Sequence, residues 1–172
     1  HTRKHVTVAL SGDAGDEPFI GYERYRWMDK VIGIYKLPHA LRRLLLSPMS
    51  ISPVAKHKLI ADGLTKSSLK EVYKSALTSH SGGLLVNPTI GAVTEYDEYL
   101  ETNKPWHEQF SDYDIKTYLN GDINTKVDRA SMAFSLEVRA PFLDHDVVEF
   151  AKSLPLKYRY NNGNLKYILK EL

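Results

Sequence analysis

The sequence predicts an α/β chain that is predominantly helical, and two observations carry this prediction. An apolar, β-branched run at residues 6 to 10 is typical of a strand, and it leads into an acidic loop that contains glycines. Much of the remaining chain places apolar residues at helical spacing between prolines and polar turns. Because ligands bind at the carboxyl ends of strands in open α/β sheets, the loop after the strand is the first candidate site.

The N-terminal elements are expected to be a strand at His5 to Leu10, a tight turn and a helix that opens at Pro18. Proline suits the first helical position, and Asp16 or Glu17 is expected to cap the free N–H groups. A single strand cannot pair with itself. We therefore expect its neighbours to come from a partner chain, from residues outside this sequence or from the extreme ends of the chain.

Short helices are expected to follow, separated by breakers. The segment 79–94 is rich in Ser, Gly and Asn and is expected to be a loop, whereas Glu137 to Phe142 is expected to be extended because Pro141 disfavours helix before it. Asp144 is expected to cap the helix that follows. The predicted helices are Ala40 to Leu46, Val54 to Ile60, Thr65 to Leu77 with Thr65 as cap, Asp112 to Leu119, Ile123 to Ser135 after a break at 120–122, His145 to Ser153, and a last one through Leu165 and Leu172.

The loop after the strand carries three carboxylates, Asp13, Asp16 and Glu17, and two glycines, Gly12 and Gly15. The glycines allow positive φ or a close backbone approach. Carboxylates would repel a bare phosphate but suit Mg²⁺, a substrate ammonium, a ribose hydroxyl or a proton to be removed. A nucleotide bound here should therefore bring a metal ion. The alternative is an ordinary acidic helix N-terminus, which gains about 0.3–1 kcal/mol per carboxylate from the helix dipole.

A second group of charges, Asp128, Arg129, Glu137 and Arg139, alternates in sign at close spacing. This pattern favours a hydrogen-bonded network that orders a turn, with direct substrate contact as the alternative. Asp128 and Arg129 stand among small and apolar residues, so one or both are expected to be buried and paired.

Two runs resemble motifs of the asparagine synthetase family. Leu10 to Trp27 reads L-S-G-D-A-G-D-E-P-F-I-G-Y-E-R-Y-R-W and resembles the family's S-G-D/E-G-x-D-E-L-F-G-G-Y-x-R-Y. Lys126 to Asp144 reads K-V-D-R-A-S-M-A-F-S-L-E-V-R-A-P-F-L-D and resembles K-V-D-R-x-S-M-A-x-S-L-E-x-R-x-P-F-L-D. Pro18 stands in place of Leu and Ile20 in place of one of the paired glycines, and both are compatible with a helix start. Asp13 stands where many members have Glu.

The resemblance implies a fold, a reaction and roles for single residues. The fold would be the C-terminal part of an adenine-nucleotide α-hydrolase-like (PP-loop ATPase) domain with a helical subdomain, with residues 1–172 as one partial domain. The reaction would be adenylation of the aspartate side-chain carboxylate by Mg·ATP, followed by attack of glutamine-derived ammonia to give asparagine, AMP and pyrophosphate. The resemblance implies that Ser11 and Gly12 contact ATP and that Asp13 lies beside the acyl-adenylate as proton acceptor. Asp16 would ligate Mg²⁺ together with an Asp of the family's pyrophosphate loop, and Glu17 would fix the turn or the substrate ammonium. The wall of the site would be shaped by Asp128, Arg129, Glu137 and Arg139.

Other parts of the family pattern are missing from this sequence. There is no Cys to act as a glutaminase nucleophile and no S-G-G-x-D-S pyrophosphate loop, since Ser81-Gly82-Gly83 runs into Leu84 and lies in the wrong order. The family's catalytic Lys lies in a loop after the helix that ends K-x-x-L-R/K-E, so neither Lys166 nor Lys170 is assigned this role. We therefore expect part of a longer protein, inactive alone, whose glutaminase domain lies elsewhere in the parent chain, with a homodimer as one possible assembly.

The amino-acid composition narrows the classes of protein to which this sequence can belong. The chain has 172 residues, 42% hydrophobic and 26% charged, which fits one globular domain. A net charge of +2 predicts neither nucleic acid nor membrane as a partner, and zero Cys fits a reducing compartment such as the cytoplasm. No zinc site is expected from the seven His. The alternatives left open are amidation of another carboxylate such as a sugar acid, β-lactam formation, and a non-catalytic helical interaction module.

Overall fold

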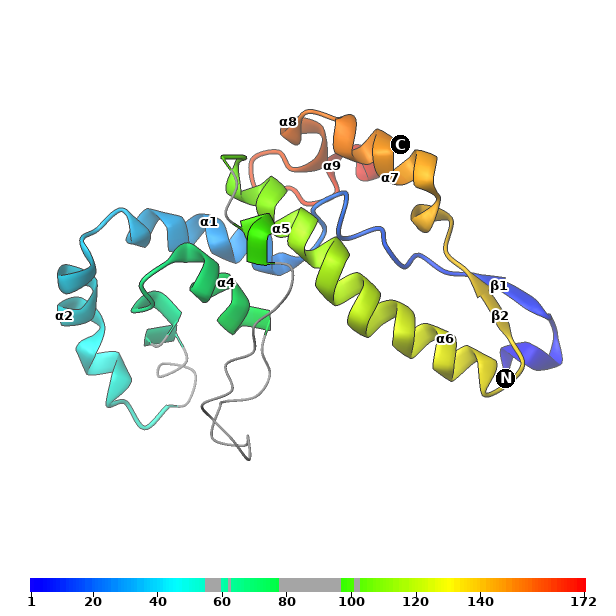
Figure 1. Cartoon of the computed structure of the whole chain (residues 1–172), viewed down its shortest axis with the longest axis horizontal. Coiled ribbons are helices and arrows are strands. Elements are labelled where there is room, and N and C mark those ends of the chain that lie inside the picture. Colours follow the sequence, from blue (N-terminus) through cyan, green and yellow to red (C-terminus); the bar gives the residue numbers. More distant parts are fainter. Residues whose placement is uncertain (55–59, 62, 78–96, 101–102) are drawn as a thin grey trace. The chain divides into compact units, whose positions relative to one another are not determined.

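The computed structural model describes residues 1–54, 60, 61, 63–77, 97–100 and 103–172 (Figure 1). These residues are mostly helical, with one short parallel sheet. The chain divides into two compact units, one formed by His1–Glu23 with Glu95–Leu172 and the other by Arg24–Thr94. Within the described ranges, no helix combines the length and the apolar character that crossing a membrane requires.

The sheet of the first unit joins strand β1 (Val8–Leu10) to strand β2 (Glu137–Arg139) in parallel (Figure 1). Val8 lies opposite Glu137 in this register, and the N–H of Ser11 donates to the carbonyl of Arg139 at 2.9 Å. Our expectation that the partner strand comes from outside the chain or from its ends was wrong. The segment before Pro141 supplies the partner from inside the chain. Pro141 and Phe142, which were also predicted to be extended, lie instead in the 3₁₀ helix η5 (Pro141–Leu143). The strand itself is shorter than predicted, because Thr2–Lys4 forms the 3₁₀ turn η1.

A long helical rod precedes β2. It consists of α5 (Trp106–Asp114), a π-helical stretch η4 (Ile115–Asn124) and α6 (Thr125–Met132), which Figure 1 shows as one continuous rod. The predicted break at 120–122 is therefore wrong. The wider turns of a π-helix accommodate this Asn-Gly-Asp sequence, and the hydroxyl of Thr125 donates to the carbonyl of Asn120 at 3.2 Å. The short 3₁₀ helix η3 (Asp97–Leu100) precedes the rod.

The C-terminal elements are η5 (Pro141–Leu143), α7 (His145–Ser153), α8 (Leu156–Arg159) and α9 (Tyr167–Glu171). The predicted bounds and cap of α7 are confirmed, because the side chain of Asp144 accepts a hydrogen bond from the N–H of Asp146 at 3.0 Å. The last helix is shorter than predicted.

The second unit contains α1 (Glu23–Tyr35) from Arg24 onward, α2 (His39–Ser50) and α4 (Leu69–Leu77), together with the described residues between them. The predicted helix at 40–46 is confirmed and extends at both ends. Thr65 does not cap α4, because its hydroxyl donates to the carbonyl of Ala61 at 2.8 Å and α4 begins only at Leu69. Most of the predicted helix at 54–60 and all of the predicted loop at 79–94 lie outside the described residues.

Candidate functional site

The acidic loop after β1 is a turn that continues to residue 22, and helix α1 begins only at Glu23. The prediction that a helix opens at Pro18, capped by Asp16 or Glu17, is wrong. Two residues of this segment, Ala14 at φ +65° and Ile20 at φ +56°, adopt the left-handed conformation, which a right-handed helix excludes. The N–H of Gly21 closes the turn by donating to the carbonyl of Asp16 at 2.7 Å.

Gly15 of this turn acts through close approach, whereas Gly12 shows neither a positive φ nor an atom within 4 Å of a Cβ placed on it. A Cβ at Gly15 would lie 3.1 Å from the carbonyl oxygen of Gly12, whereas the positive φ angles belong to Ala14 and Ile20. A β-branched residue is strained in the left-handed region, and Ile20 stands where the resembled motif has glycine. The fully buried Ile20 side chain packs into the core and offsets that strain.

A cavity of about 310 Å³ lies beside the turn, and both sequence motifs line it. Ser11 and Asp13 contribute from the turn, and the Ser11 hydroxyl donates to the Asp13 carboxylate at 2.8 Å. The other lining residues come from η4, α6 and the segment that contains β2. They are Asn124, Val127, Asp128, Ser131, Met132, Glu137, Val138, Ala140 and Leu143. The parallel pairing of β1 with β2 thus brings together two motifs that are far apart in the sequence.

The second charge group is only partly as predicted. Asp128 and Arg129 are both exposed, so the expectation of a buried pair on α6 is wrong. Asp128 lines the cavity together with Glu137. Glu137 and Arg139 form an ion pair at 2.7 Å, but more than half of each side chain is exposed, so the pair contributes no more than about 1 kcal/mol. Helix α6 carries its charges toward solvent and the cavity rather than into the core.

The side chain of Glu17 is buried and stabilises the turn to which it belongs. Its Oε1 accepts a hydrogen bond from the Tyr22 hydroxyl at 2.5 Å, and its Oε2 has no hydrogen-bond partner in the described part of the chain. Burial raises the pKa of the Glu17 carboxyl, against the lowering effect of the Tyr22 hydrogen bond, and the nearby Asp114 and Asp16 add to the rise. Of the two roles expected for Glu17, its geometry favours fixing the turn.

Replacing Glu17 with glutamine should change the pH dependence of stability. Because the folded-state pKa lies above the ordinary value of 4.5, Glu17 favours folding while it is protonated, and this contribution is lost as pH rises through the raised pKa. Glu17→Gln removes the titration. Relative to wild type, its free energy of unfolding should be unchanged near about pH 4 and higher near about pH 8. Urea unfolding across that range checks this, and a difference that does not vary with pH would contradict it.

Asp16 is the predicted magnesium ligand, and its Oδ1 pairs with the Lys166 ammonium at 2.9 Å. Across the described residues, no group of three or more His, Cys, Asp or Glu side chains is arranged to hold a metal ion. Protein sites for Mg²⁺ commonly supply one or two carboxylates, with water and substrate phosphates as the other ligands. Asp16 is not among the residues that line the cavity. As a single carboxylate it fits a cation only as one ligand beside the phosphates of a nucleotide.

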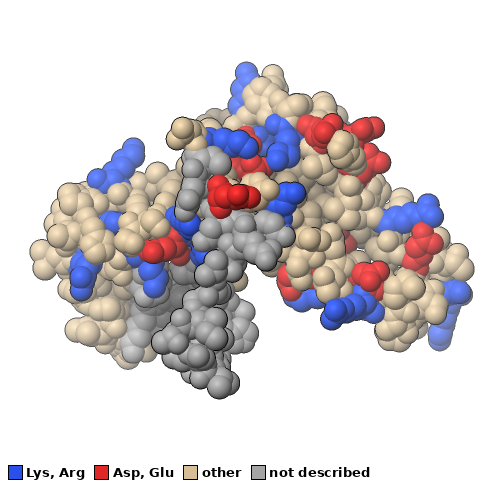
Figure 2. All heavy atoms as spheres, in the orientation of Figure 1, with Lys and Arg blue, Asp and Glu red and all other residues tan. Residues whose placement is uncertain are grey.

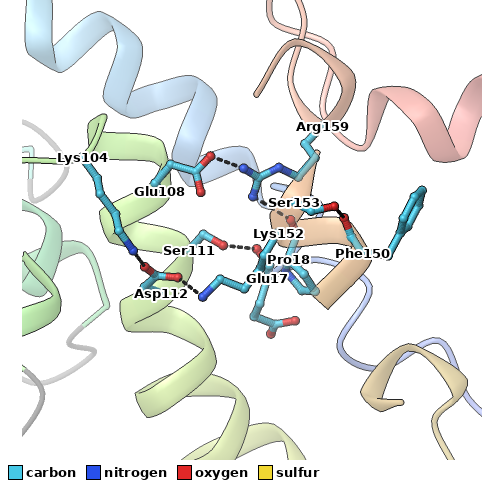
Figure 3. A network of polar contacts seen from close by, with 10 residues as sticks. All are labelled: Glu17, Pro18, Lys104, Glu108, Ser111, Asp112, Phe150, Lys152, Ser153 and Arg159. Atoms are coloured by element: carbon cyan, nitrogen blue, oxygen red, sulfur yellow. Dashed lines mark hydrogen bonds and ion pairs between the residues drawn. The ribbon is translucent and has the colours of Figure 1, made fainter. Parts of the chain in front are cut away.

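A buried polar network contacts the backbone of the turn (Figure 3). Arg159 is 1% exposed; its guanidinium pairs with the Glu108 carboxylate and donates to the carbonyl of Pro18 at 3.2 Å. The Ser111 hydroxyl donates to the carbonyl of Glu17 at 2.7 Å. Helices α5 and α8 thus hold two successive backbone carbonyls of the turn.

The same face of α5 carries Asp112, which lies between Lys104 at 2.7 Å and Lys152 at 2.5 Å (Figure 3). Burial acts to raise the pKa of the Asp112 carboxyl, but the hydrogen bonds from Lys104 and Lys152 outweigh it and lower that pKa. Our reading of the sequence missed this network. The sequence signal for this network is a set of polar residues on the inner face of an amphipathic helix. That pattern does not indicate which residues they contact.

The charges at the surface are mixed. On the face drawn in Figure 2, Lys and Arg side chains are interspersed with Asp and Glu. That face therefore carries no large patch of one sign of charge.

A strand, an acidic turn at its carboxyl end and a cavity beside that turn form the arrangement in which α/β proteins commonly bind ligands. The family model described as asparagine synthase matches residues 1–172, and the chain belongs to this family. It is 34% identical over 182 residues to asparagine synthetase [glutamine-hydrolyzing] 1 of Bacillus subtilis, and this alignment covers 98% of this chain and 28% of that protein. It is 27% identical over 169 residues to asparagine synthetase [glutamine-hydrolyzing] 3 of the same organism, covering 98% of this chain and 24% of that protein.

The chain thus spans about a quarter of the length of the curated relatives it matches. No solved structure matches it significantly. The resemblance that the two motifs indicated is confirmed by the family match.

Proposed function

We propose that this chain is part of the synthetase domain of an ATP-dependent amidotransferase. The complete protein would adenylate the side-chain carboxylate of aspartate and transfer glutamine-derived ammonia to it, giving asparagine, AMP and pyrophosphate. The observation that carries the proposal is the cavity beside β1, because the acidic turn and the second motif both line it. The glutaminase domain would lie elsewhere in the complete protein, which would work in the cytoplasm, and the isolated chain would have no turnover.

The chemistry explains why an acidic turn would stand at this place. A carboxylate oxygen is a poor leaving group, so the aspartate carboxylate must first attack the α-phosphorus of ATP and release pyrophosphate. Ammonia then attacks the acyl carbon, a proton leaves the nitrogen, and AMP departs. Asp13 lines the cavity and would accept that proton. Ser11, which also lines the cavity, and its neighbour Gly12 would contact the nucleotide.

The metal ion would be held by Asp16 together with the phosphates of ATP. When bound, it would neutralise the charge that develops on the phosphates. Glu17 would keep the turn in shape, and Asp128 and Glu137 would form the opposite wall of the cavity.

The finer fold that we propose is the PP-loop ATPase fold. Its support is the parallel pairing of β1 with β2, since parallel sheets occur almost only with several strands and with both faces covered. Leu10 at the end of β1 is 74% exposed, which is unusual for such a strand. Further strands of the complete protein would extend this sheet, and their connecting helices would cover Leu10.

The test is product analysis with the complete protein. Incubation with Mg·ATP, aspartate and either glutamine or ammonium should yield AMP, pyrophosphate and asparagine in equal amounts. Release of pyrophosphate with a sugar acid or a β-lactam precursor, but not with aspartate, would instead identify another carboxylate as the substrate. An interaction module would release none with any of these substrates, and this result would contradict the proposal.

A further inference from the structure

The cation that stands beside Asp16 has no role in the reaction described so far. Lys166 lies far along the chain, at the N-terminal cap of α9, yet its Nζ is 2.9 Å from Oδ1 of Asp16. About two thirds of each side chain is buried. The pair is therefore formed between the acidic turn and the C-terminal segment of the same unit.

The backbone on the lysine side is set for this contact. Lys166 adopts the left-handed conformation, with φ +51° and ψ +40°, which is uncommon for a residue other than glycine. Such a conformation persists only where the surrounding structure determines it. The preceding Leu165 is buried and anchors the segment, so the position of the Lys166 side chain follows from the packing of its neighbour.

The backbone on the turn side is open for the same contact. A Cβ at Gly21 would lie 2.0 Å from Oδ1 of Asp16 and 2.2 Å from Cε of Lys166. The ion pair therefore crosses directly over the α-carbon of Gly21, and no side chain fits at that position without moving the pair. Gly21 is also the member of the paired glycines that this chain keeps.

The geometry points to Lys166 as the positioning residue that orients Asp16 for Mg·ATP, an inference that rests on the proposed metal role of Asp16. The ammonium contacts Oδ1, so Oδ2 is the oxygen that would bind the cation. Groups that hydrogen-bond a metal-ligating side chain fix its orientation, and losing one typically lowers metal affinity about 10- to 100-fold. Lys166 does not touch the reacting atoms in this account.

Charge alone predicts the opposite result, which makes the inference testable. If Lys166 merely occupied Asp16 as a competing cation, its removal would free the carboxylate and strengthen metal binding. If Lys166 positions the carboxylate, its removal weakens metal binding although a positive charge is lost.

The experiment measures Mn²⁺ binding to the complete protein in the presence of α,β-methylene ATP, by the loss of the free Mn²⁺ resonance signal. The variants are Lys166→Met, Lys166→Arg and Asp16→Asn, with Lys170→Met as the matched control because Lys170 is exposed on the same helix. Lys166→Met should lower the affinity about tenfold or more, Lys166→Arg should restore most of it, and Lys170→Met should not change it. The melting temperature of ligand-free Lys166→Met should stay within about 4 °C of wild type.

The outcomes separate the two claims. Weak binding by Asp16→Asn together with wild-type or tighter binding by Lys166→Met overturns the role of Lys166 and leaves the proposed function intact. Wild-type binding by Asp16→Asn overturns the metal role of Asp16, and the inference falls with it. If Lys166→Met and Lys166→Arg bind Mn²⁺ equally, and both more weakly than wild type, then a cation at position 166 does not orient Asp16 and the inference is overturned.

Discussion

Asparagine in place of Asp13 should lower the rate of asparagine formation by about 10²- to 10⁴-fold, the usual contribution of a general base. The amide has nearly the same shape as the carboxylate but cannot accept a proton from the attacking ammonia. The Ser11 hydroxyl, which donates to Asp13 at 2.8 Å, can still donate to the amide oxygen, so the turn should keep its shape. The rate is measured in the complete protein with aspartate, Mg·ATP and ammonium.

The step affected by Asp13→Asn distinguishes a proton acceptor from a binding residue. Adenylation precedes the attack of ammonia, so exchange of labelled pyrophosphate into ATP should continue in the variant. Asp146→Asn serves as the control, because Asp146 is almost fully exposed on α7 and away from the cavity lining. Wild-type asparagine formation by Asp13→Asn would contradict the role of Asp13, and loss of the exchange reaction would place its effect in the first step.

Breaking the buried ion pair between Arg159 and Glu108 should lower the free energy of unfolding more than any of the other substitutions. Arg159 is 1% exposed and Glu108 is 20% exposed on its side chain, so Glu108→Gln leaves a buried guanidinium without its carboxylate. Removing one partner of a buried pair typically costs about 3–5 kcal/mol, and the partial exposure of Glu108 places the expected cost near about 3 kcal/mol. Urea unfolding of the complete protein, followed by a probe in this domain, measures it.

The double variant Arg159→Met with Glu108→Met gives the second arm of this test. Replacing both charges with apolar side chains of similar size is often close to neutral, so the double variant should recover much of the stability that Glu108→Gln loses. Lys157→Met is the control, since Lys157 is exposed on the same short helix α8 as Arg159. A double variant that is less stable than Glu108→Gln would contradict this prediction. It would show that the two side chains stabilise the fold by more than neutralising each other's charge.

The parts of the site that the sequence predicts are those with local causes. Pro141 predicts an extended segment before it, and β2 lies there and ends at Arg139. Asp144 predicts the cap of α7 because the capping bond spans only two residues. The sequence also predicts an acidic turn after a strand, because an apolar run followed by glycines and carboxylates is a local pattern.

The parts that the sequence does not predict depend on tertiary contacts. Ile20 is left-handed because its side chain is buried, and local preference favours glycine there. The break expected at 120–122 is absent because the rod continues as a π-helix through it. Arg159 reaches Pro18 across most of the chain, and no short pattern connects the two.

The pairing of β1 with β2 is the contact on which the site depends most. It places Ser11 beside Arg139 and thereby gives the acidic turn and α6 a common cavity. The sequence identifies both segments but not their register, because a three-residue parallel ladder carries no periodic signal long enough to align them.

The central claim is that the acidic turn and the second motif line one Mg·ATP site, and a crystal structure of the complete protein with Mg²⁺ and α,β-methylene ATP tests it most directly. The account predicts the nucleotide in the cavity beside β1, in contact with Ser11 and Gly12, with an oxygen of Asp16 about 2.0–2.1 Å from the metal ion. A nucleotide bound elsewhere, with this cavity empty and Asp16 still paired only with Lys166, would contradict it.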